Sequence, residues 1–171
     1  LSRDHTLQVS QSGLVTITGG KWTTYRKMAE DTVDHAAVLA GVELRECTTR
    51  DLQIHGAHAH ADRFGHLSVY GTDALLIEGL AEEAQGGDER LDAALPYLEA
   101  EVRWAAREEM ARTVEDVLSR RTRALLLDAR AAIRAAPRVA DSLAEELGRD
   151  DAWVTGQLAE FEAVAAGYVV G

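Results

Sequence analysis

Residues 17–31, ITGGKWTTYRKMAED, are the stretch of this chain best suited to chemistry. An apolar segment leads into Gly19-Gly20 and Lys21, and Thr23-Thr24 precede a helical pattern. Glycines let a backbone approach a ligand closely, and a helix start favours anions because its first N–H groups have no intrahelical acceptor. The pattern therefore indicates an anion site at Gly19, Gly20, Lys21, Thr23 and Thr24. A tight strand-to-helix connection with a threonine cap would use the same residue types.

Two common nucleotide signatures are absent from this stretch. A P-loop would require a glycine where Val15 stands and a hydroxyl residue where Trp22 stands, and no GxGxxG occurs. Arg3 supplies a second cation: if the segments on either side of the Gln11–Gly13 turn pair as a hairpin, Arg3 and Lys21 fall at the same end. Two cations beside a helix start form a candidate site for a phosphate or an anionic cofactor.

The other reactive residue types favour no site. His55, His58 and His60 could supply three imidazoles to zinc, but no helical spacing fixes them, and no cysteine or carboxylate stands at a recognised ligand interval. A solvated loop is favoured, and no metal is expected. Cys47 has Arg45 nearby but no histidine or helix start beside it, so a nucleophile is not indicated.

The hydrophobic pattern predicts the elements that carry these residues. Strands are expected in residues 1–10 and 14–18, with a linker at 42–51. Helices are expected over residues 25–39, 74–84, 96–118, 123–135, 137–147 and 151–166. The predicted fold class is mainly α: an N-terminal β-hairpin plus helix, followed by an all-α helical C-terminal domain. A lone hairpin is marginal in water, so its partner is expected in sequence outside this chain.

Composition limits the functional classes. The 171 residues are 46% hydrophobic and 27% charged, as in a soluble globular protein. A net charge of −11 argues against nonspecific nucleic-acid binding. No apolar run is long enough to span a bilayer, and no signal-peptide pattern is present. The single cysteine indicates a reducing compartment, and the start at Leu1 without methionine indicates a fragment.

The charged segment 101–123 is interpreted as a solvated helix face. Glu108 and Arg112, and likewise Asp116 and Arg120, stand four residues apart as helix-surface ion pairs do. The Arg120-Arg121-Arg123 cluster could also dock an acidic partner.

Three blocks of the sequence resemble one family. SRDHTL, TITGGKWTTYRKMAEDTVD and LPYLEAEVRWAAREEMARTVEDVLSRRTRALLLDA are similar to the C-terminal part of FAD-dependent, aerobic-type, quinone-linked glycerol-3-phosphate dehydrogenases. The resemblance covers essentially the whole chain. It implies that residues 1–40 are the C-terminal segment of the FAD and substrate domain, and that residues 49–171 are a helical C-terminal domain.

The resemblance also implies a reaction: sn-glycerol 3-phosphate is oxidised to dihydroxyacetone phosphate by hydride transfer to FAD, and the electrons pass to quinone. Arg3 matches the family arginine that grips the substrate phosphate, and Lys21 matches the catalytic lysine beside flavin and substrate. Gly19, Gly20, Thr23 and Thr24 match the turn and helix start that contact FAD.

The family's N-terminal Rossmann half is not in these 171 residues, so the fragment alone is expected to be inactive. FAD is expected to be held mostly by that N-terminal FAD domain of the same polypeptide. A cytoplasmic location is expected. Attachment to the inner face of the cell membrane and a homodimer stay open. The alternative from another class is a non-catalytic helical protein-interaction module, in which the hairpin would be buried on the chain's own helices.

Overall fold

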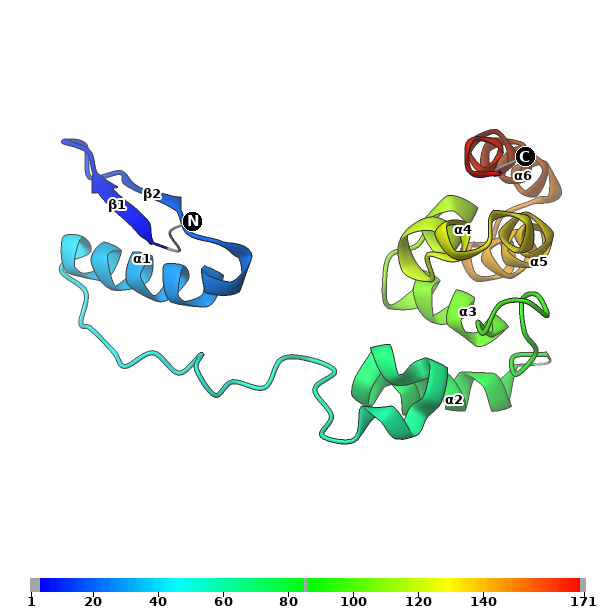
Figure 1. The fold of residues 1–171 in the computed structure, drawn as a ribbon, viewed down its shortest axis with the longest axis horizontal. Coiled ribbons are helices and arrows are strands. Elements are labelled where there is room, and N and C mark those ends of the chain that lie inside the picture. The colour runs from blue at the N-terminus through cyan, green and yellow to red at the C-terminus, as the bar shows by residue number, and fades with distance from the viewer. Residues whose placement is uncertain (1–3, 85, 170–171) are drawn as a thin grey trace. The chain divides into compact units, whose positions relative to one another are not determined.

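The computed structural model describes residues 4–84 and 86–169. The chain divides into two compact units, Leu1–Ile54 and His55–Gly171, each of which is described by itself (Figure 1). The predicted fold class is confirmed: an antiparallel two-stranded hairpin comes first, and helices make up most of the rest. None of the helices in the described part is long and apolar enough to cross a bilayer.

The first unit is a hairpin followed by one long helix. Strands β1 (His5–Val9) and β2 (Val15–Gly19) pair so that His5 faces Gly19 and Val9 faces Val15. A short 3₁₀ turn, η1 (Trp22–Thr24), leads into α1 (Tyr25–Ala40). Gly41 ends α1 in the left-handed region, with its N–H donating to the Ala37 and Val38 carbonyls, as glycine C-caps do. Residues 42–54 form no helix or strand, which confirms the predicted linker.

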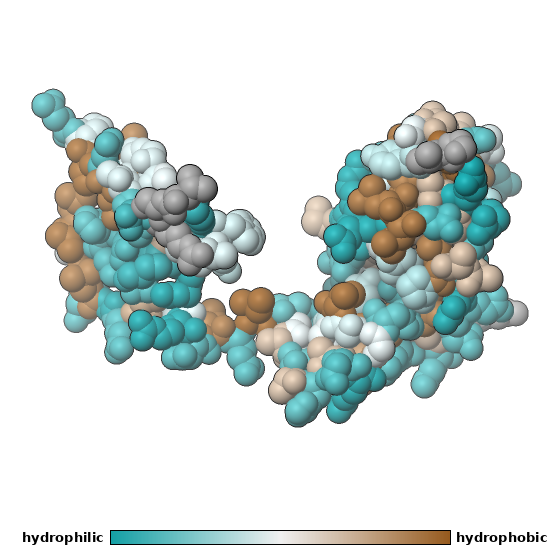
Figure 2. All heavy atoms as spheres, in the orientation of Figure 1, coloured by the Kyte–Doolittle hydropathy of each residue, from teal (hydrophilic) through white to brown (hydrophobic). Residues whose placement is uncertain are grey.

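None of the described residues of this first unit is buried. Large apolar side chains lie on its surface, with Trp22 85% exposed and Val33 64% exposed. Figure 2 shows apolar residues gathered along one side of it. A hairpin and a single helix offer too little interior to remove such side chains from water, so the unit has no core of its own.

The second unit is helical and has a well-buried core. Its elements are η2 (Ala61–Asp73), α2 (Ala74–Glu83), α3 (Glu99–Arg107), the π-helical η3 (Asp116–Arg121), α4 (Ala124–Leu127), α5 (Ala129–Leu147), α6 (Asp151–Ala165) and η4 (Ala166–Tyr168). Val102, Val117, Leu118, Leu143 and Phe161 belong to the larger buried cluster. A smaller cluster, which includes Phe64, Ile77 and Trp104, joins η2 and α2 to α3.

The helix predicted over residues 96–118 was wrong as one element. α3 ends at Arg107, and Met110 adopts a left-handed conformation with φ 58°. Arg112 donates from Nη1 to the Ala106 and Ala111 carbonyls, so its guanidinium holds the turn closed. Because these contacts join a side chain to backbone across the break, helical spacing could not reveal them. The predicted ion pair between Asp116 and Arg120 is confirmed. Arg112, which was predicted to pair with Glu108, binds these two carbonyls.

The two helices predicted over residues 123–135 and 137–147 were also wrong in their bounds. α4 has four residues, and α5 begins at Ala129 after Asp128, whose side chain accepts the Ala131 N–H as an N-cap. Pro137 lies inside α5, although proline removes one helical hydrogen bond. Five neighbouring apolar residues are buried on this helix and offset that loss: Ala135, Ala136, Val139, Ala140 and Leu143.

Candidate functional site

The Gly19-Gly20-Lys21 turn has the conformation that its glycines permit. Gly19 has φ 83° and Gly20 has φ 71°, both in the left-handed region. A Cβ at Gly19 would lie 3.0 Å from the Asp4 carbonyl oxygen, and one at Gly20 would overlap the Met28 sulfur. The sequence therefore needs glycine at both positions, first for the backbone angles and second for the close approach of neighbouring atoms.

Thr24 fixes the backbone of Lys21 to the start of α1. Its hydroxyl accepts the Lys21 N–H at 3.0 Å and donates to the Lys21 carbonyl at 3.0 Å. The Thr24 N–H also donates to that carbonyl. The Thr24 hydroxyl is therefore engaged within the turn, whereas Thr23 is exposed.

Lys21 itself is exposed and makes no ion pair with any residue that the structure describes. Trp22 stacks on Tyr25 beside it, with ring centroids 5.2 Å apart. The predicted cofactor residues Gly19, Gly20 and Lys21 are thus brought together on one exposed turn. Arg3, the predicted phosphate ligand, lies outside the described residues.

A polar cluster that the sequence reasoning missed lies behind this turn. Asp31 of α1 accepts from His5 of β1 at 3.0 Å through Oδ2 and from Lys27 at 2.8 Å through Oδ1. We call these three residues the His5–Asp31–Lys27 clamp. A cavity of about 250 Å³ beside it is lined by Asp4, His5, Thr24 and Lys27. The spacing of four residues between Lys27 and Asp31 could have predicted their ion pair. The contact of His5 could not be predicted in this way, because His5 lies 26 residues before Asp31.

The charges of α1 keep this cluster ionised. Hydrogen bonds that Lys27 donates to Asp31 and Glu30 raise the pKa of Lys27 to about 12. Lys27, and to a smaller extent His5, lower the pKa of Asp31. Lys27 and Arg26 lower the pKa of Glu30 to about 2. At neutral pH the carboxylates are therefore fully charged acceptors.

An apolar groove lies on the same unit. It has a volume of about 420 Å³ and is lined by Ile17, Tyr25, Met28, Ala29, Thr32 and Val33. The hairpin and α1 both contribute to it, so the face next to the turn is open and hydrophobic.

The histidine loop forms local contacts. His55 binds Asp73 at 2.6 Å, and the His58 ring packs edge-on against Phe64. Within the described residues, no three His, Cys, Asp or Glu side chains are grouped so as to hold a metal ion. Cys47 lies 3.0 Å from the Thr49 hydroxyl.

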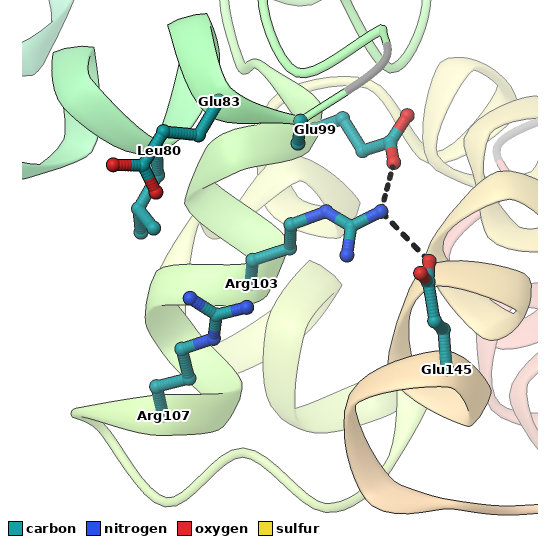
Figure 3. Close-up of a pocket in the computed structure, with 7 residues that line it drawn as sticks. Leu80, Glu83, Glu99, Arg103, Arg107 and Glu145 are labelled. Carbon is teal, nitrogen blue, oxygen red and sulfur yellow. Dashed lines mark hydrogen bonds and ion pairs between the residues drawn. The ribbon is translucent and has the colours of Figure 1, made fainter.

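A pocket of the helical unit, of about 590 Å³, is lined mostly by charged side chains, and among them Arg103 binds Glu99 and Glu145 (Figure 3). Arg103 donates to Glu99 at 3.2 Å, to Glu145 at 2.8 Å and to Glu146 at 3.0 Å. Arg107 binds Glu146 through two nitrogens, each at 2.7 Å. Because the arginines already bind carboxylates, this pocket presents a closed ion-pair network that joins α3 to α5.

The arginine cluster 120–123 is likewise used within the unit. Arg120 binds Glu115 and Asp116, and Arg121 donates to the Glu109 carbonyl. These contacts join η3 to its own helix start and to the turn after α3. The predicted role in docking an acidic partner stays a prediction.

One buried carboxyl group stands out in the helical unit. Glu101 of α3 is 1% exposed; it accepts the Leu98 N–H at 2.7 Å and the Tyr70 hydroxyl at 3.1 Å. Burial raises the pKa of Glu101 to about 7 and also raises the pKa of Tyr70. His66 Nε2 lies 3.6 Å from Glu101, and burial lowers the pKa of His66. These opposite shifts favour the uncharged form of each side chain near neutral pH.

The chain is similar to named proteins along most of its length. It is 37% identical over 179 residues to the probable mitochondrial glycerol-3-phosphate dehydrogenase of Caenorhabditis elegans, covering 92% of this chain and 25% of that protein. It is 38% identical over 180 residues to the mitochondrial glycerol-3-phosphate dehydrogenase SDP6 of Arabidopsis thaliana, covering 85% and 28%. The chain thus spans about a quarter of the length of these relatives.

A solved structure shares the fold. The glycerol-3-phosphate dehydrogenase of Bacillus halodurans, complexed with FAD, matches with a TM-score of 0.68 and 27% identity over 94% of this chain and 36% of that one. Residues 13–154 match the family described as the C-terminal domain of alpha-glycerophosphate oxidase. This range includes the glycine turn, α1 and the helical unit up to the start of α6. The chain therefore belongs to the family of C-terminal domains found in alpha-glycerophosphate oxidase and FAD-dependent glycerol-3-phosphate dehydrogenases.

Proposed function

We propose that this chain is the C-terminal part of a flavoprotein that oxidises sn-glycerol 3-phosphate to dihydroxyacetone phosphate and passes the electrons to quinone. The observation that carries the proposal is the Gly19-Gly20-Lys21 turn. It lies within the range that matches the family, and it presents an exposed ammonium group with no ion-pair partner among the described residues.

The residues present fit one wall of an FAD site. Gly19 and Gly20 allow close backbone approach, and Lys21 is an exposed cation at the start of a helical segment. FAD, when bound, would supply the acceptor for the hydride that leaves the substrate carbon. Gly19, Gly20, Lys21, Thr23 and Thr24 would form the chain's contacts to it.

The chain's own part in the reaction is to bind and to position charge. Arg3 and Lys21 would hold the substrate phosphate, since guanidinium and ammonium groups are the usual ligands of phosphate. Lys21 would also stabilise negative charge that develops next to it, and such a fixed charge contributes more in a site from which water is excluded. Residues 1–40 would complete the FAD and substrate domain, and residues 49–171 would form the helical C-terminal domain.

Taken by itself, the first unit offers a surface that suits this assignment. No described residue of residues 4–54 is buried within it, and the hairpin has two strands with an open edge on each. The alternative is a non-catalytic helical interaction module. The N-terminal FAD domain of the same polypeptide is the partner we propose for this surface.

For location, we propose the cytoplasmic face of a membrane that carries quinone, with peripheral attachment. Quinone is dissolved in the membrane, so the electrons must reach that surface. The relatives from Caenorhabditis elegans and Arabidopsis thaliana are named as mitochondrial proteins. A homodimer is compatible with the proposal.

The test is glycerol-3-phosphate:dye reductase activity of the full-length polypeptide, with FAD supplied. Lys21→Ala is expected to lower kcat/KM by about 10²-fold or more, as removal of a preorganised charge does. Arg3→Ala is expected mainly to raise KM. Arg50→Ala, which removes one exposed cation from the linker, is the matched control and should change little. A full-length protein without flavin and without activity would refute the proposal and favour the interaction module.

A further inference from the structure

The His5–Asp31–Lys27 clamp joins the hairpin to α1. His5 is in β1, and Asp31 lies in the second turn of α1. The His5 ring is 18% exposed and the Asp31 side chain 28%, so both groups are partly shielded from water. A partly shielded, charge-assisted hydrogen bond is stronger and more directional than a solvated one.

The glycine turn depends on both of the elements that the clamp joins. The Gly20 N–H donates to the Asp4 carbonyl at 2.9 Å. This bond attaches the turn to the start of β1, where His5 faces Gly19. Thr24 attaches the following residue, Lys21, to the start of α1. The turn is thus held at one end by the hairpin and at the other by the helix.

Among the described residues of this unit, other side-chain contacts between the hairpin and the helix are apolar. The apolar contacts there, such as those of Ile17 and Met28, are half-buried, and no described residue of the unit is buried. The other ion pairs of α1 join Arg26 and Lys27 to Glu30, all on the helix itself. The bond between His5 and Asp31, by contrast, connects β1 to α1.

We propose that Asp31 is a positioning residue of the glycerol-3-phosphate site: by binding His5 it holds β1 against α1 and so sets the place of the turn that carries Lys21. This inference rests on the proposed function. Asp31 acts through His5 and the Asp4 carbonyl and does not itself touch the substrate.

The test compares variants of the full-length, FAD-loaded protein. Asp31→Ala and His5→Leu both remove the bond and are expected to lower kcat/KM for glycerol 3-phosphate by about tenfold, mainly through KM, because a misplaced binding group costs that much or more. His5→Gln keeps an N–H donor on the side chain and should restore kcat/KM to within about threefold of wild type.

Glu30→Ala is the matched control. It removes two ion pairs from the same helix, one of them to the same Lys27, but it leaves the hairpin contact intact. It should change kcat/KM by less than about twofold, as expected for partly exposed pairs. A loss of activity in Glu30→Ala equal to that in Asp31→Ala would overturn the proposal, because a general weakening of α1 would then account for both.

Hydrogen exchange of the same proteins supplies a measurement that does not need activity. Asp31→Ala should speed exchange of the Gly20 amide, whose bond to Asp4 depends on the clamp, whereas Glu30→Ala should not. Unchanged Gly20 exchange in Asp31→Ala would also overturn the proposal. If the wild-type protein oxidises no glycerol 3-phosphate, the proposed function fails, and the exchange result still decides whether Asp31 holds the turn.

Discussion

Replacing Glu101 with glutamine should change how the stability of the helical unit depends on pH. The carboxyl group is 1% exposed, and burial raises its pKa from 4.5 to about 7. Between these two values the unfolded chain ionises Glu101 while the folded chain keeps it protonated. A rise in pH through this window therefore favours unfolding, and the cost reaches its full size above pH 7.

The magnitude follows from the two pKa values. One pKa unit corresponds to about 1.4 kcal/mol, so the full cost of ionising Glu101 is about 3 kcal/mol at pH 8. At pH 5.5 the same linkage gives about 1.4 kcal/mol, so stability should fall by about 2 kcal/mol across this range because of this group alone. Glutamine resembles the protonated acid: its oxygen can accept the Leu98 N–H, and its amide can donate to the Tyr70 hydroxyl.

Urea unfolding of the 171-residue chain, followed by circular dichroism from pH 5.5 to 8, measures this effect. The free energy of unfolding of Glu101→Gln minus that of wild type should rise by about 2 kcal/mol over the range. His66→Gln is the control, since the lowered pKa of His66 gives a pH dependence of the opposite sign. A difference between Glu101→Gln and wild type that is constant with pH would refute the reasoning.

Substitutions at three further positions test the fold of the helical unit. Gly71 and Gly65 have the same backbone angles, φ 58° and ψ −122°, but a Cβ would overlap the Gly56 carbonyl at Gly71 and meet nothing within 4 Å at Gly65. Gly65→Ala should lower the free energy of unfolding by about 1–3 kcal/mol, because alanine is strained at these backbone angles. Gly71→Ala should lower it clearly more, because its Cβ would also overlap the Gly56 carbonyl. Equal losses for the two variants would contradict the overlap. Asp128→Ala should cost about 1 kcal/mol by removing the N-cap of α5, and Asp128→Asn should restore it, as thermal unfolding would show.

The local part of this fold could be predicted from the sequence. Alternating residues on either side of the turn near Gly13 predicted the hairpin, and the helical spacing that ends at Gly41 predicted α1. The glycine turn could be predicted as well, because two glycines between a strand and a helix start specify a local conformation. Each of these depends on neighbours within a few residues.

Breaks between helices could not be predicted in this way. The chain leaves α3 after Arg107 and turns at Met110, where Arg112 and Arg121 bind backbone carbonyls that helical spacing would have placed inside a helix. It continues through Pro137 because the surrounding face of α5 is buried in the core. The first outcome depends on side chains that bind backbone groups, which helical spacing does not report. The second depends on packing partners distant in the chain, and that packing outweighs local propensity.

For the candidate site, the sequence by itself determined the residue types and the glycine turn. Only the tertiary structure decided what supports them. The bond from His5 to Asp31 joins residues 26 apart, and Met28 occupies the space that a side chain on Gly20 would need. Such contacts arise when a strand folds back on a helix, and the distance between two residues in a sequence does not report their distance in space.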